Sequence, residues 1–160
     1  MNMPQEIANK LQIHQWSLSI AESCTGGLVS STLTAIPGAS SWFNEGIVVY
    51  TPRSKQNRLN ISMEDILKHG AVSSYISKQL ANHIRISSPS DLGIGITGNA
   101  GPNISDKSKL GDVYIAISSL NDELCNHYSF KGNRLAIQDQ AVQATLKMLF
   151  HYLCEKQDFR

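Results

Sequence analysis

The chain has 160 residues, a length that accommodates one ordinary domain with its own hydrophobic core. Hydrophobic residues make up 41% and charged residues 17%, and this composition excludes disorder driven by low hydrophobicity. The 14 Lys and Arg residues nearly balance the 13 Asp and Glu residues. This balance disfavours nucleic acids and membranes as partners, because both attract clustered positive charge. We expect a small-molecule partner.

The amino-terminal residues 1–10 lack the basic-then-apolar order of a signal peptide, and no stretch approaches the roughly 18 apolar residues of a membrane helix. Cys24, Cys125 and Cys154 form no CxxC pair, so we expect free thiols. The five histidines are not at metal-ligand spacing. These patterns predict a cytoplasmic protein without a metal or cofactor.

The first part of the chain alternates helical and strand-like hydrophobic periods. The apolar residues recur at helical spacing, then at every second position, and a turn rich in polar residues and glycine follows. In chain order, the predicted elements are a helix over 4–12, a strand over 16–21, a polar turn over 22–27, a helix over 28–35, a buried strand over 46–51 and a helix over 52–59.

The second part continues the alternation and ends in a strand meander and a long helix. Its predicted elements are a helix over 62–68, a helix from Ser73 or Ser74 to near Pro89, strands over 91–97, 113–118 and 124–130, and a helix from 134 or 136 to 153. The last strand is expected at a sheet edge. The whole pattern predicts an α/β fold, a three-layer sandwich on a mixed β-sheet, as one domain over 1–160 with its core at about 5–153.

Sheets of this kind bind ligands at the carboxyl ends of their strands. Three polar loops follow predicted strands and are therefore the candidate site, over residues 22–27, 50–55 and 97–111. The segment 93–98 matches the GxGxxG pattern of dinucleotide sites. Its first two glycines lie inside the strand pattern and no helix follows, so a dinucleotide site is not predicted here.

The turn after the first strand places Ser23 before a helix start. The backbone N–H groups of Thr25, Gly26 and Gly27 would be unpaired there and could hold a phosphate or an oxyanion. The same pattern is also typical of a plain helix cap, in which a hydroxyl caps the helix and the glycines permit a tight turn. The sequence alone leaves both interpretations open.

Three further residues mark the other candidate loops, and a fourth lies at the start of the last predicted helix. Lys55 could act as a general base if burial lowered its pKa, with the Tyr50 hydroxyl beside it, although a single lysine is more often solvated. Thr97 ends a strand in a sharp turn, which is either a cleft wall or an ordinary turn. Arg134 could hold a phosphate or carboxylate, whereas an arginine at a helix start is usually exposed.

Six segments in order resemble one family, the carboxy-terminal domain of the competence/damage-inducible protein CinA, whose stand-alone members include bacterial nicotinamide mononucleotide deamidases. The likeness spans about residues 5–150. The matching segments are Ala21-Glu22-Ser23-Cys24-Thr25-Gly26-Gly27, residues 37–43, Gly46-Ile47-Val48-Val49-Tyr50 with Lys55, His69-Gly70-Ala71-Val72-Ser73, Thr97-Gly98-Asn99-Ala100-Gly101-Pro102 and Gly111.

This resemblance implies a metal-independent amidohydrolase that converts nicotinamide mononucleotide to nicotinate mononucleotide and ammonia, and a homodimer. By motif, Ser23 matches the nucleophile, Lys55 its base, and Tyr50 a neighbour in the same site. The residues implied in substrate binding are Cys24, Thr25, Gly26, Gly27, Thr97, Gly98, Asn99 and Arg134.

The sequence departs from the family pattern in two places. The stretch 103–110 replaces a glycine-rich loop, and Gln138 and Asp139 stand where active deamidases typically carry arginines. The alternative function is therefore a weak or inactive paralogue that binds a nucleotide or a partner protein in the same cleft, or an amidase for another amide. Cys24 is an alternative nucleophile, because a thiol at a helix start has a lowered pKa.

Overall fold

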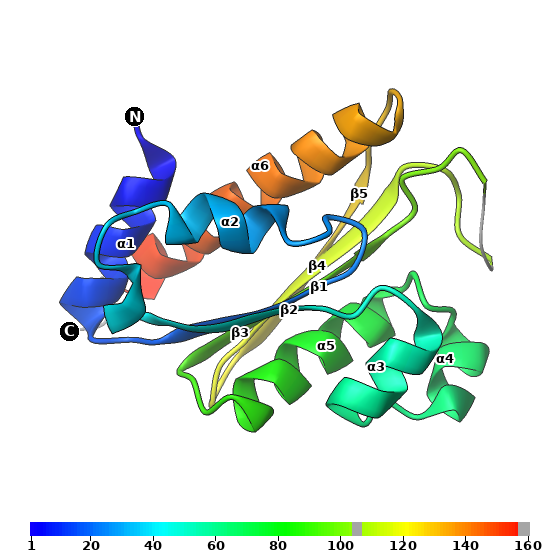
Figure 1. Ribbon diagram of the computed structural model, residues 1–160, viewed down its shortest axis with the longest axis horizontal. Coiled ribbons are helices and arrows are strands. Elements are labelled where there is room, and N and C mark those ends of the chain that lie inside the picture. The colour runs from blue at the N-terminus through cyan, green and yellow to red at the C-terminus, as the bar shows by residue number, and fades with distance from the viewer. Residues whose placement is uncertain (104–106, 157–160) are drawn as a thin grey trace.

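The computed structural model of the chain describes residues 1–103 and 107–156, and these form a single domain on a five-stranded sheet (Figure 1). The elements in chain order are α1 (Met3–His14), β1 (Leu18–Glu22), α2 (Leu28–Thr34), the 3-10 helix η1 (Ala39–Ser41), β2 (Phe43–Val48), α3 (Pro52–Leu59), α4 (Met63–His69), α5 (Ser74–Ser87), β3 (Leu92–Gly98), β4 (Asp112–Ser118), β5 (Glu123–Ser129) and α6 (Arg134–Glu155).

The sheet is mixed, and its strand order is β2-β1-β3-β4-β5. Strand β1 pairs in parallel with both β2 and β3, whereas β3, β4 and β5 form an antiparallel meander. The carboxyl ends of β1, β2 and β3 therefore lie at one end of the sheet. The three predicted polar loops meet there because each follows one of these strands.

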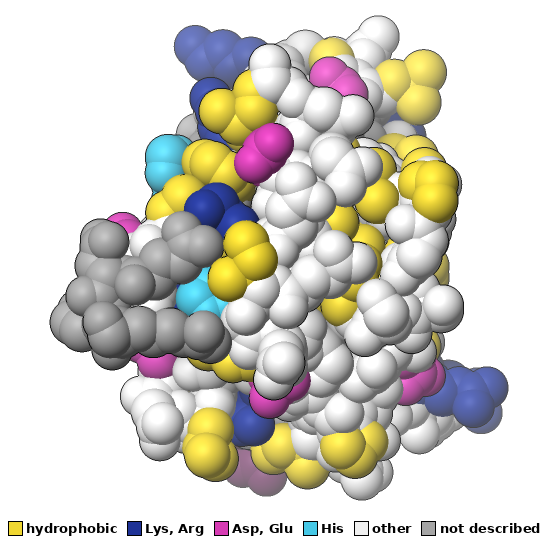
Figure 2. Space-filling model, turned by 90° about the vertical axis from the view of Figure 1, so that its left-hand side faces the viewer, with side chains coloured by type: hydrophobic (Ala, Val, Ile, Leu, Met, Phe, Trp, Pro, Cys, Tyr) yellow, Lys and Arg dark blue, Asp and Glu magenta, His cyan; other side chains and the backbone are white. Residues whose placement is uncertain are grey.

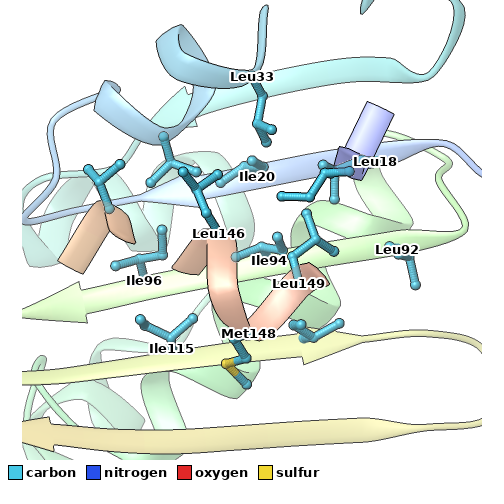
Figure 3. Packing of buried hydrophobic residues seen from close by; sticks show 14 of the residues in the cluster. Leu18, Ile20, Leu33, Leu92, Ile94, Ile96, Ile115, Leu146, Met148 and Leu149 are labelled. Carbon is cyan, nitrogen blue, oxygen red and sulfur yellow. The ribbon is translucent and has the colours of Figure 1, made fainter. Parts of the chain in front are cut away.

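Helices cover both faces of the sheet, which confirms the predicted three-layer α/β fold (Figure 1). Helices α1, α2 and α6 lie on one face, and α3, α4 and α5 lie on the other. Figure 3 shows apolar side chains of β1, β3 and β4 packed against α6 and α2 on the first face. The labelled members of this buried cluster are Leu18, Ile20, Leu33, Leu92, Ile94, Ile96, Ile115, Leu146, Met148 and Leu149.

Two details of the fold differ from the sequence-based prediction. The strand expected to be buried over 46–51 is β2, which spans Phe43–Val48 at the edge of the sheet with mostly exposed side chains. Its β-branched run favoured a strand but carried no information on the number of neighbouring strands. The short η1 was not predicted. Strand β5 lies at the opposite edge, as expected.

The face of the molecule seen in Figure 2 carries charged side chains of both signs, scattered among apolar and polar ones. This mixture agrees with the near-balance of positive and negative residues in the sequence. In residues 1–103 and 107–156, no helix combines the length and the apolar character that crossing a membrane requires.

Gly93 and Gly95 explain the GxGxxG-like pattern in physical terms. Both lie in β3 directly beneath α5, and a Cβ atom at Gly95 would stand 2.2 Å from the Ser77 carbonyl oxygen. At Gly93 it would stand 2.1 Å from the Ala81 carbonyl oxygen. The two glycines therefore allow a helix backbone to approach the sheet, and they do not form a nucleotide loop.

We expect Gly95→Ala to lower the free energy of unfolding by about 1–3 kcal/mol, because the added methyl group meets helix backbone that cannot rotate away. Urea denaturation measures this change. Glu123→Ala on the exposed face of β5 is the control and should stay within about 0.5 kcal/mol of the parent protein. An unchanged unfolding midpoint for Gly95→Ala would contradict the close packing of α5 on β3.

Candidate active site

A serine and a lysine from different loops meet at the carboxyl end of the sheet. Ser23 directly follows β1, and its backbone N–H donates to the Ile96 carbonyl oxygen at 3.0 Å, which fixes it to the neighbouring strand β3. Lys55 lies in the first turns of α3, which begins after the side-chain cap of Thr51 at Pro52. The Lys55 Nζ atom is 3.1 Å from the Ser23 Oγ atom.

Lys55 is held in place by backbone carbonyl groups. Its Nζ atom donates to the Val49 carbonyl oxygen at 2.9 Å and to the Tyr50 carbonyl oxygen at 3.4 Å. A neutral amine has two N–H groups and one lone pair. The charged amine donates its third hydrogen to Ser23 Oγ, whereas the neutral amine can keep its two N–H groups on these carbonyls and turn its lone pair to the Ser23 hydroxyl. This is the arrangement that a general base requires to remove a proton from a serine.

Burial favours the uncharged amine. The Lys55 side chain is only 1% exposed, and this burial lowers its pKa from 10.5 to about 8. Within the described part of the chain, the ion pairs are His127–Asp112 and Lys156–Asp122, so no carboxylate neutralises the amine. About a tenth of the Lys55 side chains are therefore uncharged at pH 7.

The geometry disfavours Cys24 as the nucleophile. Burial raises the pKa of its thiol from 9.0 to about 12, so the reactive thiolate is scarce at neutral pH. Its neighbour Ser23 has the amine contact instead. The alternative of a lowered thiol pKa at a helix start is contradicted, because the Cys24 side chain is buried.

Ser23 and Lys55 line a cavity of about 700 Å³. One of its walls is apolar and comes from α4 and the segment after it, through residues such as Ile66, Leu67 and Val72. Sequence analysis did not identify this wall, because its side chains carry no chemistry of their own. Within the described residues, no group of three or more His, Cys, Asp or Glu side chains is placed to hold a metal ion.

Another part of the lining contains predicted residues from the end of β3 and the loop after it. Thr97, Gly98 and Asn99 all line the cavity. The Thr97 hydroxyl donates to the Ala71 carbonyl oxygen at 2.7 Å, so it joins the two walls. The Asn99 side-chain amide donates to the Ser108 hydroxyl at 3.1 Å and thereby anchors the later part of the same loop.

Arg134 and Tyr50 lie together at the edge of the cavity. The Arg134 guanidinium donates to the Tyr50 hydroxyl and, at 2.6 Å, to the Gly101 carbonyl oxygen. It thus connects the loop after β2 with the loop after β3. Lys107 also lines the cavity, so the lining contains two cationic side chains besides Lys55. The arrangement can attract an anionic group of a ligand.

Three predicted binding residues are placed outside the cavity lining. The Thr25 hydroxyl donates to the Glu22 carboxylate at 2.6 Å, and the Gly26 N–H donates to the Ser23 carbonyl oxygen at 3.1 Å. Gly27 forms the helix cap at a φ of 97°. The start of α2 is occupied by the protein's own carboxylate, Glu22, which the sequence analysis did not identify as a partner of these groups.

The two departures from the family pattern have different positions. The Gln138 side chain donates to the Cys24 carbonyl oxygen at 2.9 Å and so supports the turn that carries Ser23. Asp139 is exposed and does not line the cavity. In the stretch 103–110, Asn103 and Lys107 line the cavity, whereas residues 104–106 lie outside the described residues.

The layers and the buried serine–lysine pair define an α/β domain with a candidate nucleophile and base at the carboxyl ends of parallel strands. A family model described as the CinA C-terminal domain matches residues 1–153. The chain therefore belongs to the CinA C-terminal domain family.

Individual relatives agree with this assignment. CinA-like proteins of Syntrophotalea carbinolica and Acidobacterium capsulatum are each 39% identical to the chain, over 86% and 92% of its length. The chain spans about a third of the length of these curated relatives, at 34% and 36%.

Solved structures show the same fold. A CinA superfamily protein from Klebsiella pneumoniae superposes with a TM-score of 0.91 at 27% identity, over 96% of both chains. A competence or damage-inducible protein from Enterobacter asburiae gives a TM-score of 0.91 at 29% identity, over 94% of this chain and 96% of that one.

Proposed function

We propose that the chain is an amidohydrolase that converts nicotinamide mononucleotide to nicotinate mononucleotide and ammonia. The observation that carries this proposal is the 3.1 Å contact between the Ser23 hydroxyl and a buried amine of lowered pKa. Such a pair supplies a nucleophile and a base without a third residue. The substrate follows from the resemblance to the stand-alone deamidases in the family.

The reaction proceeds in two steps. Neutral Lys55 takes the hydroxyl proton of Ser23 while Oγ forms a bond to the carboxamide carbon. The carbon–nitrogen bond then breaks as the Lys55 ammonium returns that proton to the leaving nitrogen, which departs as ammonia. Water attacks the resulting ester of Ser23 with Lys55 again as the base, and this releases the carboxylate product and restores the serine.

The cavity suits a substrate with an apolar ring and an anionic tail. The pyridine ring would lie against the apolar wall of Ile66, Leu67 and Val72, close to the serine. The phosphate would lie toward Arg134 and Lys107. Both cations line the same cavity as Ser23, so one molecule can contact all three parts of the site.

The alternative of a non-catalytic paralogue rests on Gln138 and Asp139. The Asp139 carboxylate lies outside the cavity lining, and Gln138 supports the Ser23 turn by a hydrogen bond. Neither position removes the nucleophile or the base. Calorimetry that detects tight nucleotide binding without hydrolysis would favour the paralogue, and measurable deamidation would exclude it.

We expect Ser23→Ala to reduce ammonia release from nicotinamide mononucleotide to less than about one thousandth of the parent rate, because the nucleophile is lost. An enzyme-coupled ammonia assay measures this loss, and the parent activity should persist with a chelator present. Ser40→Ala, at an exposed serine of η1, is the matched control with unchanged turnover. Sustained deamidation by Ser23→Ala would remove Ser23 as the nucleophile.

The proposed base predicts a defined pH profile. Because the amine acts when uncharged and its pKa is about 8, kcat/KM should rise about tenfold per pH unit below pH 8 and level off above it. Lys55→Ala should lose about a hundredfold in rate and this pH dependence, and Lys131→Ala at an exposed lysine should retain both. Near-parental rates in Lys55→Ala would reject the serine–lysine pair.

A further inference from the structure

A buried carboxylate stands next to the proposed nucleophile in the chain. Glu22 is the last residue of β1, and none of it is exposed to solvent. Its Oε1 atom accepts from the Thr25 hydroxyl at 2.6 Å and from the Val29 N–H at 3.0 Å. Its Oε2 atom accepts from the Ser30 N–H at 2.9 Å and from the Ser30 hydroxyl at 2.7 Å.

These four donors replace the solvation that burial removes. Within residues 1–103 and 107–156, no cation forms an ion pair with Glu22. The carboxylate instead accepts two amide N–H groups at the start of α2, where the helix dipole favours negative charge. Each oxygen therefore has two donors. These bonds join the two ends of the segment 22–30, which includes Ser23.

Glu22 and Ser23 act on opposite faces of the sheet. Glu22 contacts α2, which covers the first face, whereas Ser23 contacts Lys55 of α3 on the other face (Figure 1). This follows from the alternation of side chains along an extended chain. The carboxylate therefore does not line the cavity, and its hydrogen bonds act on Ser23 through the backbone.

The backbone of Glu22 is also connected to Lys55 by two hydrogen bonds through Val49. Its carbonyl oxygen accepts the Val49 N–H at 2.9 Å, and the Val49 carbonyl oxygen accepts the Lys55 Nζ hydrogen at 2.9 Å. The end of β1 is therefore linked to both partners. Ser23 is the next residue in the chain, and Lys55 is hydrogen-bonded to Val49, which is hydrogen-bonded to Glu22. A shift of residue 22 would change both partners of the 3.1 Å contact.

We propose that Glu22 is a positioning residue, whose buried carboxylate holds the Ser23 hydroxyl in the geometry in which Lys55 can activate it. The inference rests on the proposed function, because it concerns the reactivity of Ser23. It goes beyond helix capping, since it predicts that the four hydrogen bonds determine how fast Ser23 reacts in a fully folded protein. Small displacements of reacting groups lower rates strongly.

The test measures the reactivity of Ser23 with phenylmethanesulfonyl fluoride. In this reaction the serine oxygen bonds to sulfur, fluoride leaves, and Lys55 takes the hydroxyl proton. Glu22→Gln keeps the size of the side chain but turns an NH₂ group toward N–H and O–H donors. Intact mass spectrometry should show labelling at least about tenfold slower than in the parent, per folded molecule, well below the melting temperature.

Two further variants complete the test. Ser30→Ala removes one hydrogen-bond donor to Glu22 without changing the charge, and it should slow labelling about two- to fivefold. It provides the test of the inference if Glu22→Gln does not fold. Glu45→Gln makes the same exchange at an exposed position of β2 and should label at the parent rate.

Each outcome has one meaning. A lowered melting temperature with unchanged labelling in Glu22→Gln or Ser30→Ala would assign the carboxylate a merely structural role and overturn the inference, while the proposed function stands. Absence of labelling at Ser23 in the parent protein, together with no ammonia release, would overturn the proposed function itself and the inference with it. Slower labelling in the two variants with a normal Glu45→Gln control supports the positioning role.

Discussion

The contact between a buried amine and a serine hydroxyl is the interaction on which the site depends. An amine that is shielded from solvent and has no carboxylate partner resists protonation, and this is the property that the proposed base needs near neutral pH. The fold produces it by packing α3 against α5 and α4, so that Lys55 is enclosed and its amine contacts the Val49 and Tyr50 carbonyls and the Ser23 hydroxyl.

The sheet topology accounts for the meeting of distant segments. Residues 23, 55 and 97 are far apart in the chain, yet each follows or lies near the carboxyl end of a strand in the parallel part of the sheet. The end of β1 is central among these, because it carries Ser23 and is hydrogen-bonded to both neighbouring strands. The buried carboxylate of Glu22 ties this strand end to α2, so helices on both faces of the sheet contact the strand end that carries the proposed nucleophile.

Much of this arrangement could be predicted from the sequence. The alternation of apolar and polar residues predicted strands that end shortly before Ser23 and Lys55. Loops that follow parallel strands meet at one end of a sheet, so the two residues were expected to lie close together. The role of Glu22 was missed because an acidic residue beside a polar turn resembles an exposed loop residue, and its burial depends on the path of α2. The apolar wall from α4 and the edge position of β2 also depend on tertiary packing, which local periodicity does not encode.

The proposed chemistry requires that the amine of Lys55 lose its proton far more readily than an ordinary lysine. NMR titration of the protein with isotope-labelled lysine side chains, with the Lys55 signal assigned from the Lys55→Met variant, measures this directly. We expect the Lys55 signal to titrate with a midpoint pKa of about 8. A midpoint near the ordinary value of 10.5 would show an amine that stays charged at neutral pH and would contradict a role of Lys55 as the base.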